Sequence, residues 1–592
     1  AFQPMANCAK KVIRDNGYAE NIQLISKRST ELSVGPDGDM REKANILVTE
    51  VFDTELIGEG AIHTFAHALE NLLEKDSIVV PVSAVVYAQV VQSEKVLKWN
   101  RLQPLHVADG IVIQPPSDVQ SCAGAAAIHD IQLNQLKTSD FKCLSDPVPV
   151  FRFDFSGKTP LKFDDMSVSK FQAQHGGSCQ AVFMWWELQM DVEGDILLSC
   201  APHWAHPEPT SLQWRDHWMQ AVYYLPQEIN VHKGNQMNLC AFHDEYSLWF
   251  TVNKPNHDSN IIERPVCSCG AHIASSRMRI GMLNNSYRYQ QYAKALERMI
   301  SPKSVCLCLG DENLLPLIAS KLGVSKVFTV ENQAFCHRVI LNYIEANDLK
   351  EKIRILTKSP EDLTSEDLSG EKVDLLLAEP FFSTSLLPWD CLRFWYLRST
   401  LSQILIDPNH ILPRKVTLKG LGVHFLDLWK IRAPAGKAES FDLTAFDKLI
   451  ESSSEISDAN VEPQPLWEYP CVALTHPFDV FVFDLVHPMK CEIMQNCSEV
   501  QFASDGTCNG IALWVDYELD TDIHLTTGPQ CDICPGHPVE WDMYTKQGVH
   551  LLRSPVIVKD PSQNTIKYCA VFSPSDGTLT FKFEMNKITS TA

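Results

Sequence analysis

The chain repeats one long unit, and this repeat limits the folds open to it more than any other feature. Residues 16–32 (NGYAENIQLISKRSTEL) match residues 347–363 (NDLKEKIRILTKSPEDL) at an offset of 347 − 16 = 331. Both blocks begin with Asn, keep a lysine near the middle and end with an acidic residue followed by Leu. Residues 44–52 (ANILVTEVF) match residues 373–381 (VDLLLAEPF) at an offset of 373 − 44 = 329.

A third pair of blocks supports the same alignment. Residues 212–225 (LQWRDHWMQAVYYL) face residues 539–552 (VEWDMYTKQGVHLL), so that Trp214 stands opposite Trp541 at an offset of 541 − 214 = 327. An offset that drifts slowly across three separated blocks indicates an internal duplication rather than a short-period solenoid. We therefore expect two homologous tandem modules.

Each module is predicted to have two parts. In the second module, the apolar runs KSVCLCLG, KVFTVE, IRIL and VDLLLAE alternate with helical segments, which favours a parallel, doubly wound sheet. From about residue 411, β-rich segments punctuated by proline, such as KVTLKGLGVHFLDLW and GIALWVDYEL, predict an antiparallel barrel or sandwich. The first module follows the same order, with a shortened α/β part before strands that run from VVPVSAVVYAQVV to SLWFTV.

These patterns predict four domains, at residues 1–78, 79–265, 266–410 and 411–592. Through the repeat, Ala1 stands opposite Asn332 (332 − 1 = 331). The opening strand of the first α/β domain, its glycine-rich turn and the acid that ends its second strand would then lie before Ala1. We expect this first domain to be truncated and incomplete.

Composition narrows the class of protein. The 51 basic and 73 acidic residues give a net charge of −22, which disfavours direct binding to nucleic acid and suits either basic partners or simple solubility. The 19 cysteines are odd in number and scattered, a pattern typical of reduced thiols in a cytoplasmic or nuclear protein. No apolar run approaches the ~20 residues of a membrane span, and the first residues contain no apolar signal core.

An acidic loop is the first candidate site. The strand ANILVTE delivers Glu50 to the carboxyl edge of the predicted sheet, where ligands bind in such folds. Asp53, Glu55 and Glu59 follow within ten residues of Glu50. Two carboxylates on one loop can hold a planar guanidinium through paired hydrogen bonds. A solvated acidic loop without function is the alternative interpretation.

Longer segments carry a resemblance to a known family. TELIGEG, RDHWMQ, LPQE, RPVC, AEPFFSTSLLPW, DLWKIR and PLWEYPC are similar to protein arginine methyltransferases, and among these to the tandem-module, type III members. The acidic loop resembles the double-glutamate loop of that family, and residues 216–220 resemble its Thr-His-Trp loop, with Asp216 in place of Thr. The resemblance extends over the whole chain, including its duplication.

This resemblance implies a Rossmann-like methyltransferase domain and an antiparallel β-barrel in each module. It also implies an enzyme that transfers one methyl group from S-adenosylmethionine to arginine, giving monomethylarginine in arginine-rich proteins such as histones and RNA-binding proteins. Glu50 and Glu59 would be the catalytic glutamates that hold and polarise the guanidinium, whose pKa above about 12 prevents simple deprotonation. Asp53 and Glu55 would lie at the rim of the substrate pocket.

The family pattern assigns further residues. His217 and Trp218 would close the substrate pocket, although a packed histidine without a catalytic part remains open, and Gln220 with Glu59 would narrow the pocket to one methyl transfer. Cofactor contacts would fall on Ala1, Ser29 and Thr30. Without the glycine-rich turn, we expect the chain itself to have little activity.

The second module is predicted to lack the chemistry. Phe382, Thr384 and Pro388 stand opposite Asp53, Glu55 and Glu59, and Tyr544 stands opposite His217, whereas Glu379 is retained opposite Glu50. A single glutamate cannot form the fork, so this half is interpreted as a pseudo-enzyme that imitates a partner subunit in a pseudo-dimer.

Two cysteine motifs are candidate metal sites. Cys267, Cys269 and His272 offer three zinc-type ligands and need a fourth from elsewhere in the chain. The resemblance implies a structural zinc near this linker. Cys531 and Cys534 with His537 form a second candidate, for which free surface thiols are the simpler interpretation.

Two alternatives to a monomethylating enzyme stay open. One is a non-catalytic scaffold of the same fold, in which both halves bind partners. The other is a dimethylating member of the same family, which only product analysis excludes.

Overall fold

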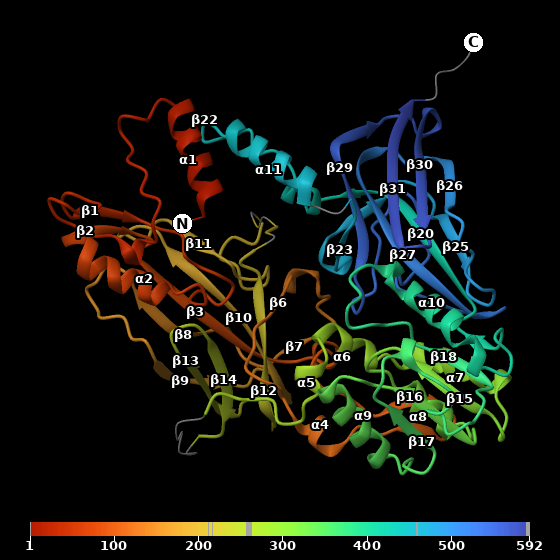
Figure 1. Cartoon of the computed structure of the whole chain (residues 1–592). Helices are drawn as coiled ribbons and strands as arrows, with labels where there is room; N and C mark the ends of the chain where they lie inside the picture. The colour runs from red at the N-terminus through yellow and green to blue at the C-terminus, as the bar shows by residue number, and fades with distance from the viewer. Residues whose placement is uncertain are drawn as a thin grey trace. The chain divides into compact units, whose positions relative to one another are not determined.

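The computed structural model describes residues 2–210, 212, 214–215, 217–255, 263–457 and 460–587. It contains two β domains, one in each module (Figure 1), whose strand orders match. The strands of the first β domain are β3 (Ser83–Gln92), β6 (His129–Ile131), β7 (Lys142–Cys143), β8 (Val148–Asp154), β9 (Asp165–Gln172), β10 (Gly177–Gln189), β11 (Leu197–Ser199), β12 (Gln220–Val231), β13 (Gln236–His243) and β14 (Leu248–Asn253). Those of the second are β20 (Lys415–Phe425), β23 (Glu462–Gln464), β24 (Cys471–Ala473), β25 (Phe478–Asp484), β26 (Met494–Gln501), β27 (Gly506–Asp520), β28 (Ile523–Thr526), β29 (Gln547–Val558), β30 (Asn564–Ser573) and β31 (Thr578–Lys587).

The two β domains have the same topology. The first contains a sheet of order β6-β12-β10-β3-β7, with β8 on β3 and β11 on β10, and a second sheet of order β14-β13-β9. The second contains β23-β29-β27-β20-β24, with β25 on β20 and β28 on β27, and a second sheet of order β26-β30-β31. Each strand of the first domain therefore has a counterpart with the same neighbours in the second. This confirms the predicted tandem modules and the antiparallel β part in each.

The second module also contains the predicted parallel sheet. The strands β15 (Val305–Leu309), β16 (Lys326–Val330), β17 (Ile353–Leu356), β18 (Leu375–Ala378) and β19 (Ile411–Leu412) pair in parallel in the order β17-β16-β15-β18-β19. The central strands are almost wholly buried, as expected for apolar runs covered on both faces. The accompanying helices are α7 (Ser286–Met299), α8 (Leu315–Lys321), α9 (Ala334–Ala346) and α10 (Arg393–Thr400).

Less α/β structure is present in the first module. It has one parallel pair, β1 (Ala44–Val48) and β2 (Leu73–Val80), where the second module has five parallel strands. The helical segments beside it are α1 (Gln3–Asp15), the 3-10 turn η1 (Ser29–Glu31), α2 (Ala61–His67) and the π-helical turn η2 (Ala68–Leu72). The expectation of an incomplete first Rossmann-like domain agrees with this difference.

The chain divides into two compact units that do not follow the module boundary. The first unit comprises Ala1–Leu97, Ala123–Val266 and Ala433–Asp458, and the second comprises Lys98–Cys122, Cys267–Arg432 and Ala459–Ala592. Each β domain thus contributes one excursion to the other unit. The excursion from the first contains β4 (Leu105–Ala108), β5 (Ile111–Ile113) and α4 (Ser117–Ser121), and α3 (Glu94–Leu97) precedes it within the first unit. The excursion from the second contains β21 (Lys437–Ala438), β22 (Phe441–Asp442) and α11 (Thr444–Ser457).

Each excursion is anchored by specific contacts inside its unit. In the first unit, α1 packs beside α11, and the Asn16 side chain donates to the Asp442 carbonyl and accepts from its backbone N–H. In the second unit, Asn347 makes the equivalent paired contact with the backbone of Gln114. Reciprocal exchange of segments is the arrangement expected of two subunits fused into one chain.

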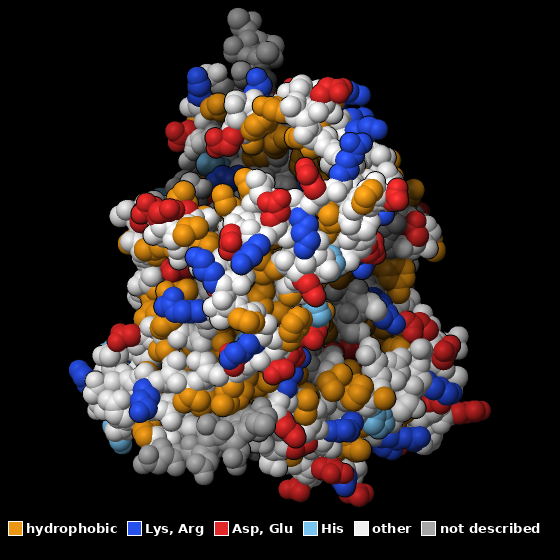
Figure 2. All heavy atoms as spheres, turned by 90° about the vertical axis from the view of Figure 1, so that its left-hand side faces the viewer, with side chains coloured by type: hydrophobic (Ala, Val, Ile, Leu, Met, Phe, Trp, Pro, Cys, Tyr) orange, Lys and Arg blue, Asp and Glu red, His pale blue; other side chains and the backbone are white. Residues whose placement is uncertain are grey.

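The remaining short elements connect these parts. The linker between the modules carries α5 (Ala271–Ala274) and α6 (Arg277–Leu283), and the 3-10 turns are η3 (Leu133–Gln135), η4 (Pro360–Asp362), η5 (Pro388–Leu392), η6 (Leu401–Ile404), η7 (Leu428–Ile431), η8 (Leu466–Glu468) and η9 (Pro561–Gln563). Among the helices of the described residues, none is long and apolar enough to cross a membrane. Acidic and basic side chains are interspersed over the face shown in Figure 2, so the acidic excess is not gathered into one patch there.

Candidate active site and metal centre

The acidic loop of the first module joins β1 to α2. Glu50 follows β1 by two residues, and Glu59 immediately precedes Gly60, the residue that caps α2 with a φ of 87°. The side chains of both glutamates are exposed. The loop therefore presents two carboxylates to solvent at the carboxyl end of a parallel strand, as a site for a cationic ligand requires.

Two tryptophans hold the backbone of this loop. The indole N–H of Trp218 donates to the Phe52 carbonyl at 2.8 Å, and that of Trp186 donates to the Asp53 carbonyl at 3.0 Å. The two indole rings meet edge to face, with centroids 5.2 Å apart. Trp218 was predicted at this site, and the structure places it in direct contact with the acidic loop. Trp186 was missed, because a tryptophan in the buried strand β10 looks like any core residue.

Asp53 stabilises the turn of the loop from within. It is partly buried, and its carboxylate accepts from the Gly58 backbone N–H at 3.0 Å. A Cβ atom on Gly58 would lie 2.0 Å from an Asp53 carboxylate oxygen, so glycine is required there. Burial raises the pKa of Asp53 above its ordinary value, although hydrogen bonds from backbone N–H groups oppose that shift.

Glu55 does not lie at the pocket rim, and that expectation is wrong. Its side chain is only 8% exposed, and it accepts hydrogen bonds from the Tyr223 hydroxyl and from the Leu248 N–H at 3.1 Å. Burial raises its pKa, and the two donors partly offset the effect. Glu55 therefore joins the acidic loop to β12 and β14. The sequence does not reveal which acidic residues of a loop have buried side chains.

Gln220 does not line the pocket either. Its amide donates to the Cys200 carbonyl at 2.9 Å and accepts from the Leu133 N–H at 3.1 Å. Its counterpart Gln547 makes the same pair of contacts in the second module, with the Thr527 carbonyl and the Leu466 N–H. A contact repeated in both halves serves the fold of the β domain, so the predicted role in limiting methyl transfer is not supported.

The other predicted residues are placed less closely. His217 is exposed, and its ring meets that of Trp218 edge to face. Ser29 and Thr30 are exposed on η1, which lies against α2. Ala1 and Asp216 lie outside the described residues.

In the second module, the retained glutamate already holds an arginine. Glu379 is fully buried after β18, and the two terminal nitrogens of Arg279 lie 3.0 and 3.1 Å from its two carboxylate oxygens. The Arg288 Nε donates to the same carboxylate at 2.8 Å, and the Tyr289 hydroxyl at 2.9 Å. Although burial opposes ionisation, the two guanidiniums lower the pKa of Glu379 to about 2.

In the second module, hydrogen bonds bridge the edge of the sheet where a cofactor would lie. The Asp311 N–H donates to the Phe381 carbonyl at 2.9 Å, and the Ser383 N–H donates to the Asp311 carboxylate at 2.7 Å. These bonds join the turn after β15 to the turn after β18. The cavity left at this edge has a volume of about 190 Å³, below the roughly 300 Å³ at which sites for drug-sized ligands begin. A cavity of this size leaves little room for a cofactor at this edge of the sheet.

Four thiol and imidazole groups converge in the second unit. The ligand atoms of Cys122, Cys267, Cys269 and His272 all lie within 4.8 Å of one another. The His272 Nδ1 faces the sulfurs of Cys267 and Cys269 at 3.8 and 3.4 Å, while its Nε2 lies 2.7 Å from the Asn100 carbonyl. Three sulfurs and one nitrogen are a complete ligand set for tetrahedral zinc, and the carbonyl fixes the orientation of the imidazole.

Cys122 is the fourth member of this cluster, which the sequence left unnamed. It precedes Cys267 by 267 − 122 = 145 residues and closes the excursion of the first β domain into the second unit. Metal-binding motifs in a sequence join ligands that are close along the chain, so none would include Cys122. Cys531, Cys534 and His537 do not form a second group of this kind within the described part of the chain.

Comparisons with known proteins identify relatives of the chain. Residues 82–254 match the family model of the arginine methyltransferase oligomerization subdomain. Protein arginine N-methyltransferase 7 of Rattus norvegicus is 41% identical over 602 residues, which cover 99% of this chain and 85% of that protein. That of Danio rerio is 41% identical over 589 residues, which cover 99% and 86%. The solved structure of Arabidopsis thaliana protein arginine methyltransferase 10 is 13% identical, with a TM-score of 0.39, and covers 54% of this chain and 100% of its own.

Proposed function

The chain belongs to the protein arginine N-methyltransferase 7 family, and from that premise we propose that its first module transfers one methyl group to an arginine side chain and stops at monomethylarginine. The donor is S-adenosylmethionine, and the substrates are arginine-rich segments of proteins such as histones and RNA-binding proteins. One observation carries the proposal. The first module keeps two exposed glutamates on an anchored loop, whereas the second keeps one glutamate that the chain's own arginines have filled.

The loop can hold a guanidinium without removing its charge. Glu50 and Glu59 each offer a carboxylate that accepts the paired N–H groups of arginine, and together they fix its plane and draw positive charge away from the nitrogen that reacts. When bound, S-adenosylmethionine supplies an electrophilic methyl group. Because the pKa of arginine is above about 12, its nitrogen gives up the proton during or after methyl transfer, to a nearby carboxylate.

Anchoring the loop matters because catalysis of this kind depends on position. Trp186 and Trp218 fix two consecutive carbonyls between the catalytic glutamates, and Glu55 ties the loop to Tyr223 and Leu248. A displacement of about 1 Å at the reacting atoms can lower a rate about a hundredfold. His217, at the pocket entrance beside Trp218, orients the substrate, and Ser29 with Thr30 borders the adenine of the donor.

The second module acts as a built-in partner subunit. Its topology repeats that of the first, and the two β domains exchange segments between the compact units. This pseudo-dimer accounts for why a module without an open site is retained. A non-catalytic scaffold would explain the closed half equally well, but it gives no reason for Glu50, Glu59 and Trp218 to be kept together in the open half.

Product analysis tests the proposal. The protein at its native length is incubated with S-adenosylmethionine and an Arg-Xaa-Arg peptide, and the peptide is examined by mass spectrometry beside a Glu59→Gln control. One methyl on arginine, absent from the control, supports the proposal. A second methyl on the same arginine favours a dimethylating enzyme. No transfer by a protein that still binds S-adenosylmethionine favours the scaffold. We expect weak turnover from the 592 residues alone, since their first α/β part has only two parallel strands.

The Cys122–Cys267–Cys269–His272 cluster is proposed to hold a structural zinc ion. The metal would tie the end of an exchanged segment to the linker inside the second unit. Elemental analysis should find one zinc per chain in the wild-type protein and none in Cys122→Ser, while Cys531→Ser keeps the metal. Zinc retained by Cys122→Ser would exclude this ligand set.

We place the protein in the cytoplasm and nucleus, which fluorescent tagging of the native-length protein tests.

A further inference from the structure

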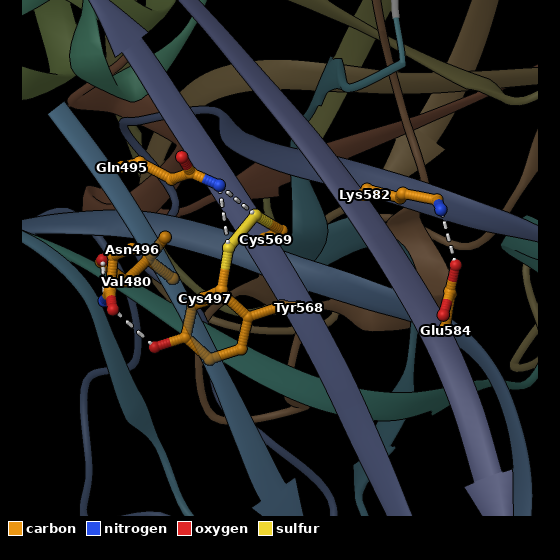
Figure 3. The surroundings of a disulfide bond; sticks show 8 residues. All are labelled: Val480, Gln495, Asn496, Cys497, Tyr568, Cys569, Lys582 and Glu584. Carbon is orange, nitrogen blue, oxygen red and sulfur yellow. Dashed lines mark hydrogen bonds and ion pairs between the residues drawn. A yellow bond between two sulfur atoms is a disulfide. The ribbon is translucent and has the colours of Figure 1, made fainter. Parts of the chain in front are cut away.

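A cysteine pair lies on the exposed face of the sheet formed by β26, β30 and β31. Cys497 of β26 and Cys569 of β30 are direct register partners in antiparallel strands, with Cα atoms 4.0 Å apart, and their sulfurs are joined in a disulfide (Figure 3). The expectation of reduced thiols throughout is therefore wrong at this pair. The two cysteines are 72 residues apart in the sequence, so the pairing became visible only once the strand register was known.

The pair differs from the other thiols of the chain. Most of the remaining cysteines are buried and free, and burial raises the pKa of thiols such as Cys306, Cys391 and Cys471 to about 12. Such thiols stay protonated and unreactive. Cys497 is exposed and Cys569 is partly exposed, so peroxides and small disulfides can reach this pair.

The neighbours of the pair suit a reactive thiol. Lys582 of β31 is the register partner of Cys569 on the side opposite Cys497, so the three residues form one row across the sheet. The Gln495 amide donates to both sulfurs at 3.2 Å. The Gln495 N–H favours the thiolate, the form that reacts, and Lys582 adds a positive charge to the same row with its ammonium directed toward Glu584 (Figure 3). Glu584, paired with Lys582 at 2.6 Å, partly balances that charge.

We propose that Cys497 and Cys569 form a reversible site of oxidative modification, reduced in a reducing environment and converted to the disulfide by hydrogen peroxide. Cys569, the cysteine beside Lys582, reacts first, and Cys497 completes the bond. The inference rests on the sheet alone and does not depend on the methyltransferase activity.

The chemistry balances with peroxide as the oxidant. The Cys569 thiolate attacks one peroxide oxygen, the O–O bond breaks, and the departing hydroxide takes a proton to become water, which leaves a sulfenic acid on Cys569. The Cys497 thiolate then attacks that sulfur, the S–O bond breaks, and the second hydroxide leaves as water. Two thiols lose two electrons and two protons, and one peroxide becomes two waters. A dithiol reductant reverses the change by thiol–disulfide exchange.

The bond would close a loop of 72 residues within the second β domain. A crosslink of this span restricts the unfolded chain and so favours the folded one. We expect oxidation to raise the unfolding temperature of this domain by about 5 °C. Because Cys569 lies in the central strand of the β26-β30-β31 sheet, oxidation fixes that strand to one neighbour while β31 stays free of the crosslink.

The experiment is peptide mapping of the intact protein with differential alkylation. Fully reduced protein is treated with hydrogen peroxide, alkylated, digested and analysed by mass spectrometry. We expect a crosslink between the peptides that contain Cys497 and Cys569, removed again by dithiothreitol. In Cys497→Ser, dimedone should trap a sulfenic acid on Cys569. The matched control Cys491→Ser removes an exposed thiol of the same segment and should leave the crosslink unchanged.

Charge variants test the order of the two steps. Lys582→Ala should slow crosslinking about threefold, and Glu584→Gln, which frees the lysine charge, should speed it by about the same factor. Two results would overturn the proposal: both thiols still alkylated after peroxide treatment of the folded protein, or crosslinks formed with Cys491, Cys531 or Cys534 instead. Equal rates in wild type, Lys582→Ala and Glu584→Gln would overturn the assignment of Cys569 as the first thiol to react.

Discussion

Glu50 and Glu379 are equivalent positions of one ancestral unit, and they have opposite environments. Glu50 is exposed at the end of β1, with a second exposed carboxylate, Glu59, at the far end of the same loop. Glu379 is fully buried at the end of β18 and is bound by two arginines of its own chain. In both cases a carboxylate at the carboxyl end of a parallel strand is suited to a guanidinium. The difference lies in whether that guanidinium belongs to a substrate or to the fold.

The supporting residues changed together with the glutamate. At the positions equivalent to Trp186 and Trp218, the second module has Val515 (186 + 329) and Thr545 (218 + 327). Val515 has no hydrogen-bond donor in its side chain, and the Thr545 hydroxyl donates to the Thr527 carbonyl at 2.9 Å instead of to the turn after β18. Loss of substrate carboxylates, loss of loop anchors and gain of an internal arginine all lead to the same closed state, in which the binding chemistry stabilises structure instead.

The largest effect is expected from removing a carboxylate that we propose to be catalytic. Glu59→Gln keeps the size of the side chain but removes the charge that polarises the substrate guanidinium, and should lower kcat/KM about a thousandfold. Glu42→Gln, an exposed glutamate just before β1, is the matched control and should leave the rate unchanged. Steady-state kinetics on an arginine peptide measure both. A Glu59→Gln enzyme within about threefold of wild type would show that the fork is not the catalytic element.

The equivalent change in the second module should affect stability instead. Glu379→Gln leaves Arg279 and Arg288 buried without their counter-charge, which should cost about 3–5 kcal/mol of the free energy of unfolding. Chemical denaturation of the second unit measures this loss. Glu361→Gln, which breaks an exposed pair with Arg393, is the control and should cost less than about 1 kcal/mol.

Glu379→Gln should also change how the free energy of unfolding depends on pH. The pKa of Glu379 is lowered from 4.5 to about 2 in the folded protein, so the unfolded chain takes up the proton first as the pH falls. The stabilisation is complete above about pH 4.5 and is lost as the pH falls toward 2. Glu379→Gln should lack this part of the acid dependence. An unchanged pH profile would mean that the buried ion pairs do not contribute as the geometry indicates.

An intermediate effect is expected from the loop anchors. Trp186→Phe keeps the aromatic packing but leaves the Asp53 carbonyl without its donor, which costs about 1–2 kcal/mol. If the loop shifts, kcat should fall about tenfold with a smaller change in KM. Trp204→Phe removes an indole N–H that donates to Gln89 rather than to the loop, and serves as the matched control. Equal kinetics for the two variants would count against an anchoring role for Trp186.

The two modules also show which features a sequence predicts and which only the fold reveals. The duplication followed from matched sequence blocks. The parallel sheet of the second module and both β domains followed from strand patterns, because strands buried on one or both faces leave a local signature. Trp218 and the cluster of Cys267, Cys269 and His272 were found through short motifs. These predictions needed only residues that are neighbours in the chain.

Contacts between distant residues were not accessible in this way. Cys122 joins the metal cluster across 145 residues (267 − 122), and Arg279 reaches Glu379 across 100. Glu55 and Gln220 were predicted to line the substrate pocket, for a related reason. A sequence does not distinguish a polar residue that hydrogen-bonds buried groups from one that lines a pocket. Only the fold distinguishes them, since it decides which donors and acceptors each side chain meets.

The smallest effect is expected from changing Glu55, whose surroundings differ from those of Glu379. Both Glu55 and Glu379 are buried, but Glu55 is bonded to a hydroxyl and a backbone N–H, whereas Glu379 is bonded to two cations. Burial therefore raises the pKa of Glu55 above 4.5, while the cations lower that of Glu379. The folded protein holds the Glu55 proton more tightly than the unfolded chain, so this stabilisation is complete below about pH 4.5 and is lost as the pH rises through the folded pKa.

Glu55→Gln should remove that dependence and change the free energy of unfolding at neutral pH by only about 1 kcal/mol, because glutamine can still accept one of the two hydrogen bonds. Denaturation curves of the first unit between pH 4 and pH 8 test the sign, and Glu42→Gln again controls for an exposed acid. If Glu55→Gln and Glu379→Gln altered the pH profile in the same direction, the partners of a buried carboxylate would not be what sets its pKa here. Opposite directions would show that the partners of a buried glutamate set the direction of its pKa shift: neutral hydrogen-bond donors at Glu55 and charged arginines at Glu379.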